Sequence, residues 1–318
     1  MLCFFDILKY MKYKLLVLGA LCAIALTGCK KANDIFKPSY KIENIQIKDT
    51  LPKVENKTAH IAFLYGQSNA DGVSYDSYLK KNDEAKFNEY AEGYNNVFIN
   101  YINDGGNNSS ELAFRKASLG CGCATYTYGP EVGIAEKMSK AFPDEQSFII
   151  KWTWGGTTLH DQWLDAKGNR GELFYFAMDF SVKCVNYLLS KGYTLSVEGI
   201  CWMQGENDAC WDRDWSVYYN DTVAFVSYLR EDLVSYSNNI KFIDAGINEE
   251  EGIWKYWDRI NKAKQEFAKL SESNIYIDTF AMGLTSKNEP EEKPDGAHYD
   301  SISMVKLGQA FGDILVGN

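Results

Sequence analysis

The sequence predicts an α/β protein in which helices cover both faces of a mainly parallel central sheet. Five short apolar runs, rich in β-branched and aromatic residues, have the length of strands. Longer stretches with helical spacing lie between or after these runs, and no repeat or low-complexity segment interrupts the alternation. A chain of 318 residues, 46% of them hydrophobic, can bury a core of the size that this fold needs.

The first 55 residues are predicted to lie outside the folded domain. In residues 1–28, two lysines precede an apolar run from Leu15 that ends in small residues before Cys29, which is the layout of a secretory signal peptide. The Leu-Thr-Gly-Cys ending resembles the lipobox of bacterial lipoproteins, which implies a lipid anchor on Cys29. The charged and polar residues 29–55 are then a tether to one domain, residues 56–318. We expect an exported, membrane-anchored lipoprotein that faces the periplasm or the cell surface.

Strands and helices alternate along the predicted domain. The apolar runs predict strands at residues 60–65, 147–154, 195–203, 240–247 and 274–280. The helical spacing predicts helices at residues 130–142, 172–193, 217–236, 253–270 and 303–315. The first of these helices opens with Pro130 and Glu131, which favour a first turn, and the second ends at Lys191-Gly192, a typical helix stop.

Ser68 lies in a polar segment directly after the first predicted strand. The segment from Tyr65 to Gly72 reads YGQSNADG and follows the apolar run HIAFL. Ligands of open α/β sheets bind beyond the carboxyl ends of the strands, which is where this segment begins. A surface loop would explain the same residues, so the interpretation depends on what the rest of the chain supplies.

A serine nucleophile needs a base within hydrogen-bond reach, usually a histidine, and a group that orients that base. The chain has three histidines. His60 opens the first strand, and His160 follows the segment GGTTL. His298 lies three residues after Asp295 in the segment DGAH, whose glycine lets the carboxylate fold back onto the imidazole. DGAH also fits a surface turn before a helix.

Two more polar loops follow predicted strands. WTWGGTTLHDQW contains Gly155 and Gly156, whose N–H groups a ligand can approach without obstruction by a side chain. CWMQGENDACW places Gln204 directly after its strand. Acyl transfer needs hydrogen-bond donors aimed at the developing oxyanion, and a glycine N–H or a glutamine amide is a suitable donor. A tight turn and a helix cap would explain each loop alone, but three such loops followed by a histidine favour a catalytic site.

The motifs in these loops resemble those of one esterase family. Five blocks occur in the order found in the sialate O-acetylesterase and acetylxylan-esterase branch of the SGNH hydrolases: GQSN at 66–69, GPE at 129–131, GGTTLHDQW at 155–163, WMQGENDA at 202–209 and DGAH at 295–298. The matching blocks extend over residues 61–312. The resemblance implies a flavodoxin-like three-layer α/β/α domain that removes acetyl groups from carbohydrates and uses no metal and no cofactor.

Carried over to the matching positions, the resemblance implies Ser68 as the nucleophile and His298 as the general base. The implied oxyanion donors are the backbone N–H groups of Ser68 and Gly156 and the side chain of Gln204. Members of this branch differ in the acid that orients the histidine, so Asp295 and Glu206 are both candidates. The short tether between Asp295 and His298 favours Asp295, with Glu206 as a second contact.

The expected substrate is an O-acetylated carbohydrate. Aromatic rings beside the catalytic loops suit the C–H faces of sugars, and the expected substrate-binding residues are Gln67, Asn69, Trp163, Asn207 and Trp211. The motifs do not choose between a sialic acid and a xylan. The carboxylate of a sialic acid would favour an arginine in the cleft, and Arg115, Arg170 and Arg213 are near the motif loops in sequence.

Two other functions are compatible with the same scaffold. A glycan-binding lipoprotein without catalytic activity is one, although both Ser68 and His298 are present. A lipase or thioesterase is the other, but it would need an apolar acyl channel, and the motif loops are polar. The net charge of −10 and the lack of a basic run argue against nucleic acid as a partner.

The cysteines predict neither a metal site nor a disulfide framework. Five of them follow Cys29 in the sequence: Cys121, Cys123, Cys184, Cys201 and Cys210. The CGC segment has no second paired cluster nearby, so no metal is expected there. Cys201 lies in an apolar run and is expected to be a buried thiol. The pairing of the others is open, and one disulfide among Cys121, Cys123 and Cys210 would suit an exported chain.

Overall fold

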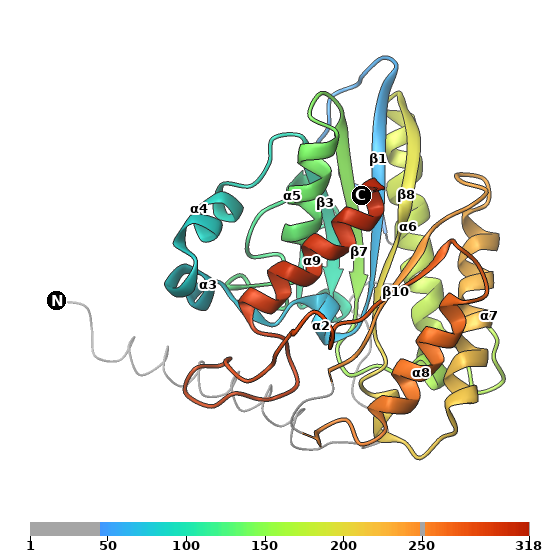
Figure 1. Ribbon diagram of the computed structural model, residues 1–318. Coiled ribbons are helices and arrows are strands. Elements are labelled where there is room, and N and C mark those ends of the chain that lie inside the picture. Colours follow the sequence, from blue (N-terminus) through green and yellow to red (C-terminus); the bar gives the residue numbers. More distant parts are fainter. Residues whose placement is uncertain (1–44, 249–251, 318) are drawn as a thin grey trace, which may run out of the picture.

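A mainly parallel sheet lies at the centre of the protein, and helices cover both of its faces (Figure 1). The computed structural model describes residues 45–248 and 252–317. The predicted signal peptide at residues 1–28 and the predicted lipid attachment at Cys29 lie outside these residues. Within the described ranges, no helix is both long enough and apolar enough to cross a membrane.

The parallel strands follow one another across the sheet in the order β10-β9-β8-β1-β7-β3. Their bounds are β10 (Asn274–Ile277), β9 (Phe242–Ala245), β8 (Tyr193–Met203), β1 (Lys57–Gly66), β7 (Gln146–Thr153) and β3 (Val97–Asn103). Two short antiparallel strands extend the sheet beside β3, namely β4 (Asn108–Ser109) and β5 (Arg115–Lys116). The central strands are almost entirely buried because helices pack on both faces of the sheet.

The register brings the strand ends to one level. Gly66 at the end of β1 lies opposite Thr153 in β7 and Met203 in β8, and Asn103 at the end of β3 also lies opposite Thr153. Because these strands are parallel, the loops that follow them all leave from the same edge of the sheet. This edge is where the sequence places the polar motif loops.

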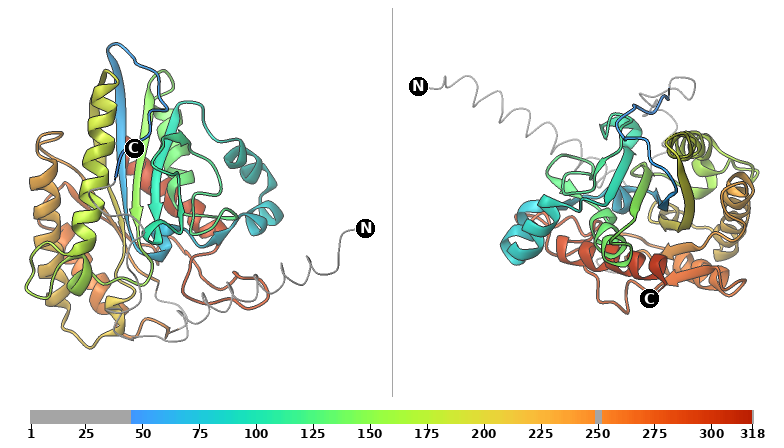
Figure 2. Two further views of the ribbon diagram at one scale, coloured as in Figure 1. Left: turned by 180° about the vertical axis from the view of Figure 1, so that it is seen from behind. Right: turned by 90° about the horizontal axis from the view of Figure 1, so that it is seen from above.

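Helices form the two outer layers. In Figure 1, α5 (Glu131–Ala141) and α9 (Ser301–Val316) lie in front of the sheet, and Figure 2 shows α6 (Glu172–Ser190) on the opposite face. The remaining larger helices are α3 (Asp76–Asn82), α4 (Glu84–Glu92), α7 (Trp215–Leu233) and α8 (Trp257–Ala268). The shorter elements are α2 (Ser68–Asp71), the paired strands β2 (Ser74–Tyr75) and β6 (Thr127–Tyr128), and single turns at Asp104–Gly106, Leu159–Trp163 and Asp208–Cys210.

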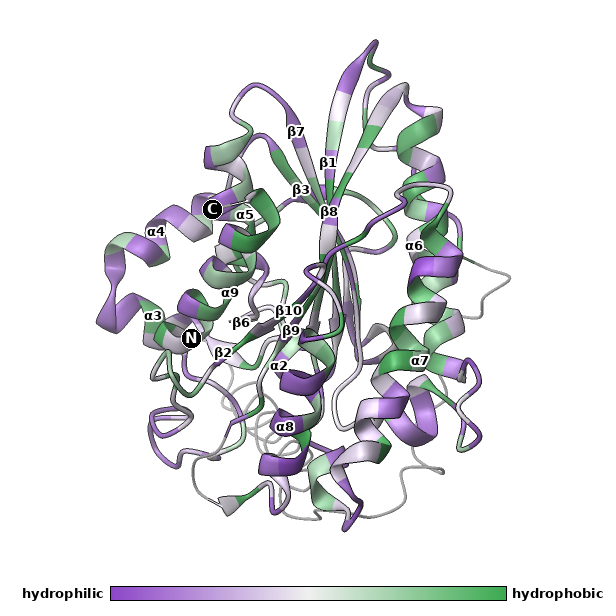
Figure 3. Cartoon of the chain, turned by 45° about the vertical axis from the view of Figure 1, so that its right-hand side comes forward, coloured by the Kyte–Doolittle hydropathy of each residue, from purple (hydrophilic) through white to green (hydrophobic). Residues whose placement is uncertain are grey.

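The contact between α5 and α9 depends on two glycines. A Cβ atom on Gly133 would lie 2.5 Å from the carbonyl carbon of Gly308, so the two backbones approach more closely than any side chain permits. This packing holds the last helix against the sheet, directly after the loop that carries His298. Figure 3 shows the hydrophobic residues gathered on the strands and on the inner helix faces, with hydrophilic residues outside.

The predicted three-layer α/β/α fold with a mainly parallel sheet is confirmed. Each predicted strand and helix is present, with end positions that differ by a few residues. β3 and the helices α3 and α4 were not predicted. The apolar pattern of β3 is broken by the buried amides Asn100 and Asn103, which obscured the strand. The cysteine pairing that the sequence left open is resolved, because none of the five cysteines in the described residues forms a disulfide.

Candidate active site

The turn after β1 presents Ser68 at the edge of the sheet. Gly66 has φ +146°, and a Cβ atom there would lie 2.0 Å from the carbonyl oxygen of Met203, so only glycine fits. The backbone then enters the short helix α2, whose first residue is Ser68. Ser68 is half-buried, and within the described chain neither its Oγ nor its N–H has a hydrogen-bond partner.

Asp295 and His298 form a hydrogen-bonded pair in the loop before α9. The Nδ1 atom of His298 lies 2.6 Å from Oδ2 of Asp295. The other carboxylate oxygen accepts the backbone N–H groups of Ala297, at 2.8 Å, and of His298, at 3.0 Å. The carboxylate therefore fixes both the loop and the imidazole ring, with Nδ1 bound and Nε2 left for other partners. Of the two predicted orienting acids, Asp295 is the one in direct contact.

Asn69 connects the serine loop to the histidine loop. Its Nδ2 donates to Oε1 of Glu206 at 2.7 Å and to the carbonyl oxygen of Ala297 at 3.3 Å. Its Oδ1 accepts the N–H of Tyr299 at 3.1 Å. Ser68 precedes Asn69, and His298 stands between Ala297 and Tyr299, so these hydrogen bonds join the loops that carry the predicted nucleophile and the predicted base.

The charges around His298 raise its pKa above the ordinary value. Burial alone would lower this pKa, but the hydrogen bond and the charge of Asp295 outweigh it, and the charges of Glu206 and Asp104 act in the same direction. Burial would raise the pKa of Asp295, but its hydrogen bond to His298 keeps it below the ordinary value. Glu206 is fully buried, and this burial raises its pKa despite the hydrogen bond from Asn69.

Gly156 supplies a second free backbone donor. Its φ of +68° favours glycine, and the position that a Cβ would occupy is open space. Within the described chain its N–H donates no hydrogen bond. Its carbonyl oxygen accepts Nδ2 of Asn207 at 2.7 Å, which brings this half-buried side-chain amide to the same loop. The arrangement offers amide donors next to Ser68.

The prediction that Gln204 donates to the oxyanion is wrong for this geometry. The side chain is fully buried, and its Nε2 donates to the carbonyl oxygen of Thr157 at 2.8 Å and to Oδ2 of Asp208 at 2.7 Å. Its Oε1 accepts the hydroxyl of Tyr218 at 2.8 Å. Both amide hydrogens are therefore used to join loops, and Asn207 is the amide that reaches Gly156.

Three of the expected substrate-binding side chains are also buried, which corrects their assignment. Trp163 is fully buried, donates from Nε1 to the hydroxyl of Thr157 and packs edge-on against Trp202 with ring centroids 4.9 Å apart. It belongs to the core. Asn69 is 1% exposed and joins the catalytic loops, and Gln67 is 2% exposed. Sequence patterns could not separate these buried residues from Asn207 and Trp211, which are half-buried.

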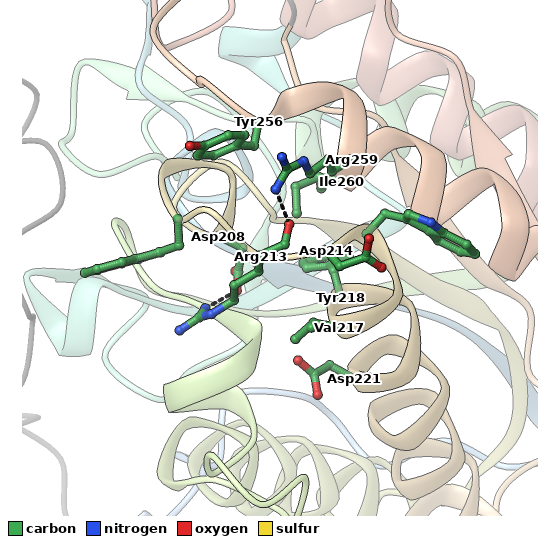
Figure 4. A pocket seen from close by; sticks show the side chains of 11 residues that line it. Asp208, Arg213, Asp214, Val217, Tyr218, Asp221, Tyr256, Arg259 and Ile260 are labelled. Atoms are coloured by element: carbon green, nitrogen blue, oxygen red, sulfur yellow. Dashed lines mark hydrogen bonds and ion pairs between the residues drawn. The ribbon is translucent and has the colours of Figure 1, made fainter.

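A pocket lies beside the loop that follows β8 (Figure 4), and its lining includes Trp211. The ring of Trp211 carries the guanidinium of Arg213 at 5.7 Å from its centroid. Arg213 pairs with Asp161 at 2.9 Å and reaches toward Asp208 at 3.8 Å, as Figure 4 shows for Asp208. The full lining is Asp208, Trp211, Arg213, Asp214, Trp215, Val217, Tyr218, Asp221, Tyr256, Arg259 and Ile260.

Each of the three histidines contacts a carboxylate, so such a contact alone does not identify the base. His60 lies between Glu145 and Glu198 near the start of β1, at the opposite end of the strand from Ser68. His160 contacts Asp221 at 2.8 Å. Among the three histidines, only His298 lies in a loop that hydrogen bonds of Asn69 join to the serine loop. The described residues contain no group of three His, Cys, Asp or Glu side chains placed to hold a metal ion.

Comparison with known proteins agrees with this geometry. Residues 58–316 match the family described as "Carbohydrate esterase, sialic acid-specific acetylesterase". The chain belongs to this family. Membership places it among carbohydrate esterases, which are hydrolases that act on esters. No curated protein matches the sequence.

Solved structures share the fold of this carbohydrate esterase family member. A protein from Arabidopsis thaliana is 17% identical, with a TM-score of 0.58, and the match covers 81% of this chain and 98% of that one. NanS is 14% identical, with a TM-score of 0.60, and the match covers 83% of this chain and 98% of that one. At these identities the likeness establishes the fold.

Asp71 and Asp104 were not predicted as site residues. Asp71 ends the helix that begins with Ser68, and Asp104 follows β3 at the same edge of the sheet. Oδ1 of Asp104 accepts the N–H of Gly155 at 2.7 Å. The available signal was the segment NDGG after an apolar run, which repeats the pattern of the other motif loops.

Proposed function

We propose that the protein is a serine esterase that removes O-acetyl groups from carbohydrates, with an O-acetylated sialic acid as substrate. The observation that carries this proposal is the joining of the Ser68 loop to the Asp295–His298 pair through Asn69. The family supports the substrate class, because its description names a sialic acid-specific acetylesterase.

In the first step, the Oγ of Ser68 attacks the acetyl carbonyl carbon while Nε2 of His298 takes the hydroxyl proton. Asp295 holds Nδ1–H and stabilises the imidazolium that forms. The tetrahedral intermediate then breaks its bond to the sugar oxygen, which leaves with the proton from His298. The products of this step are the free sugar hydroxyl and an acetyl ester on Ser68.

In the second step, water replaces the sugar. His298 takes a proton from the water as its oxygen bonds to the acetyl carbonyl carbon, and the bond to Ser68 breaks as the serine oxygen recovers that proton. Acetate leaves. In both steps the negative charge on the carbonyl oxygen needs donors, and the free N–H groups of Ser68 and Gly156 are suitable. We assign the third donor to Asn207, whose Nδ2 contacts the Gly156 carbonyl.

A neutral polysaccharide such as acetylated xylan is the second candidate substrate. Its support is that two of the three arginines considered for the sialic acid carboxylate are already paired with acidic side chains. Arg213 is paired with Asp161, and Arg170 is paired with Glu231 and Asp232. Three aspartates line the pocket near Trp211, which disfavours an anionic group there.

The test is acetate release by the purified protein from O-acetylated sialic acid and from acetylated xylan, measured in parallel. Wild type should release acetate from one of these substrates, and Ser68→Ala and His298→Ala should each lower kcat by about 10⁴-fold or more, as loss of a nucleophile or base does. His60→Gln is the matched control, because His60 also contacts carboxylates but lies at the far end of β1. It should retain activity.

The other outcomes separate the remaining functions. A folded wild-type protein that releases no acetate but binds glycans would identify a binding protein. Activity on p-nitrophenyl esters that climbs from acetyl to octanoyl would identify a lipase or thioesterase. Acetate release that survives Ser68→Ala would show that another residue is the nucleophile.

A further inference from the structure

The loop that carries the free Gly156 N–H rests on an unusual turn after β3. Asp104, Gly105 and Gly106 all have positive φ, at 45°, 64° and 103°. A Cβ on Gly105 would lie 2.8 Å from the ring of Trp154, so the turn lies flat against this tryptophan. Asp104 is the one residue of the three with a side chain, and a non-glycine residue in this conformation costs free energy that the surrounding structure must offset.

The side chain of Asp104 holds the loop that contains Gly155 and Gly156, which we call the oxyanion loop. Its Oδ1 accepts the N–H of Gly155 at 2.7 Å, and the next N–H along the chain is that of Gly156. A Cβ atom on Gly155 would lie 3.1 Å from Oδ1 of Asp104, 3.4 Å from Oδ2 of Asp71 and 3.5 Å from Cβ of Ser68. Two carboxyl groups therefore meet directly beside the predicted nucleophile.

The hydrogen bonds around Asp71 favour a proton on its carboxyl group. Nδ2 of Asn103 donates to two carbonyl oxygens, those of Cys121 at 2.9 Å and Gly122 at 2.7 Å, so Oδ1 of Asn103 is an acceptor. The hydroxyl of Thr153 contacts this Oδ1 at 2.9 Å and also contacts Oδ1 of Asp71. A hydroxyl has one hydrogen. If Thr153 donates it to Asn103, the contact with Asp71 is satisfied only when Asp71 is the donor.

The surroundings of Asp71 agree with a neutral acid. Its side chain is 1% exposed, and its Oδ2 has no hydrogen-bond partner within the described chain. Lys151 is near, but its Nζ donates to Glu131 and to the backbone carbonyl oxygens of Asp71 and Cys121, not to the Asp71 carboxyl. Burial and the charge of Asp104 raise the pKa of Asp71 well above its ordinary value, and the thiol of Cys123 is also within electrostatic range.

We propose that Asp71 is a protonated acid beside the side chain of Asp104, and that this pair positions the loop whose Gly156 N–H receives the oxyanion. The proton of Asp71 starts a chain of donors that runs through Thr153 and Asn103 to backbone carbonyls. Asp104 fixes Gly155, and its charge adds to the field at His298. Both are positioning residues. The role of Asp71 and Asp104 in catalysis rests on the esterase function proposed above.

The field at His298 comes from three elements. Asp295 acts from its own loop, Glu206 from the loop after β8, and Asp104 from the turn after β3. Removing one of these negative charges lowers the pKa of His298. Removing the proton-bearing carboxyl of Asp71 leaves it unchanged, because that group carries no charge.

The experiment compares Asp71→Asn, Asp104→Asn and Asp104→Ala by NMR titration of the histidine C–H signals. The chain has only three histidines, so the His298 signal is assigned by its loss in His298→Gln. We expect the pKa of His298 to fall in both Asp104 variants and to stay at the wild-type value in Asp71→Asn. This readout needs no substrate, so it is independent of whether the proposed esterase activity is found.

Steady-state kinetics on p-nitrophenyl acetate then separate the effect of the Asp104 charge from its effect on the position of the loop. Asp104→Asn keeps an oxygen that accepts the Gly155 N–H, whereas Asp104→Ala removes it and should lower kcat about 10- to 100-fold with little change in KM, as loss of loop position does. Asp71→Asn should lower kcat less than Asp104→Ala does, because its amide can donate to Thr153 as the acid does. Infrared spectra should show a protonated-carboxyl band that is missing in Asp71→Asn.

Two results would overturn the proposal. A fall in the His298 pKa in Asp71→Asn as large as that in Asp104→Asn would show that Asp71 is ionised. An unchanged kcat in a folded Asp104→Ala variant of an active enzyme would show that Asp104 does not position the loop. If Asp71→Asn fails to fold, the protonated-carboxyl band of the wild type is compared with that of Asp104→Asn: a shift of the band supports a protonated Asp71, because Asp104 lies beside Asp71, and an unshifted spectrum contradicts it.

Discussion

At the scale of single residues, the site depends on side chains that hold other groups in place. Asn69 is buried and bonds both loops that carry the predicted nucleophile and base. Asp295 uses one carboxylate oxygen for the imidazole and the other for the backbone of the same loop. Such double use fixes a side chain more firmly than one hydrogen bond, because each bond restricts the geometry of the other.

Asp295→Asn should change the pH dependence of the esterase. The Asp295 contact outweighs burial in raising the pKa of His298, so its loss lowers that pKa. The general base works when neutral, so the acidic limb of kcat/KM should move to lower pH. The plateau kcat should fall by about 10³-fold or more, because the imidazolium and its tautomer lose their partner. The measurement is kcat/KM from pH 4 to 9 on an activated acetyl ester.

Glu206→Gln is the companion variant. Glu206 contacts Asn69 and acts on His298 only through its charge, so the same shift should be smaller and the loss of kcat lower. Equal small losses in both variants would refute the orienting role of either acid.

Asn207→Ala tests the third oxyanion donor. Loss of a side-chain donor to the oxyanion should lower kcat by about 10²- to 10³-fold and leave KM nearly unchanged. Gln204→Leu serves as the comparison, because Gln204 joins Thr157 and Asp208 and its loss should mainly lower the free energy of unfolding. A wild-type kcat in Asn207→Ala would remove Asn207 from the mechanism.

At the scale of elements, the site is a product of strand register. β1, β7, β8 and β3 end at one level, so four polar segments that are far apart in sequence converge at one edge of the sheet. The glycine contact between α5 and α9 holds the helix that follows the histidine loop. Each loop contributes groups to the site, and the strand register sets the distances between those groups.

A buried lysine of β7 ties these elements together. Lys151 is fully buried, and its Nζ donates to Glu131 at the start of α5 at 2.9 Å and to the carbonyl oxygens of Asp71 and Cys121. Lys151→Met should lower the free energy of unfolding by about 3–5 kcal/mol, because the Glu131 carboxylate is left buried without its partner. Urea denaturation gives the value. Lys269→Met removes an exposed ion pair with Glu266 and should change the stability little. Equal effects of the two substitutions would contradict this account.

At the scale of the whole molecule, the described domain is a carbohydrate esterase. The predicted signal peptide at residues 1–28 lies outside this domain and concerns export. We propose that the chain is exported and anchored by a lipid on Cys29, which keeps the esterase at a membrane surface. Metabolic labelling with an alkyne fatty acid in a bacterial host should mark the wild type and not Cys29→Ser, and only the wild type should sediment with membranes. Cys210→Ser, which removes a half-buried thiol, should keep the label. Labelling that persists in Cys29→Ser would refute the anchor.

Much of the fold was predictable because its signals are local. Apolar runs and helical spacing located the strands and helices of the parallel sheet, since side-chain periodicity reflects which face of an element is buried. β3 was missed because it carries the buried amides Asn100 and Asn103, a polar pattern that a local rule assigns to a loop. The candidates Ser68, His298 and Asp295 were found because each lies in a short segment with a recognisable turn.

The sequence by itself determined the family, the fold class and the segments that carry the chemistry, because motifs and periodicity are written in consecutive residues. Only the tertiary structure decided which side chains those segments turn toward the site. It placed Gln204, Trp163, Gln67 and Asn69 inside the protein and brought Asn207 to the oxyanion loop. It also brought Asp71 against Asp104. Burial and proton sharing depend on contacts between residues far apart in the chain, and those contacts exist only once the strands are in register.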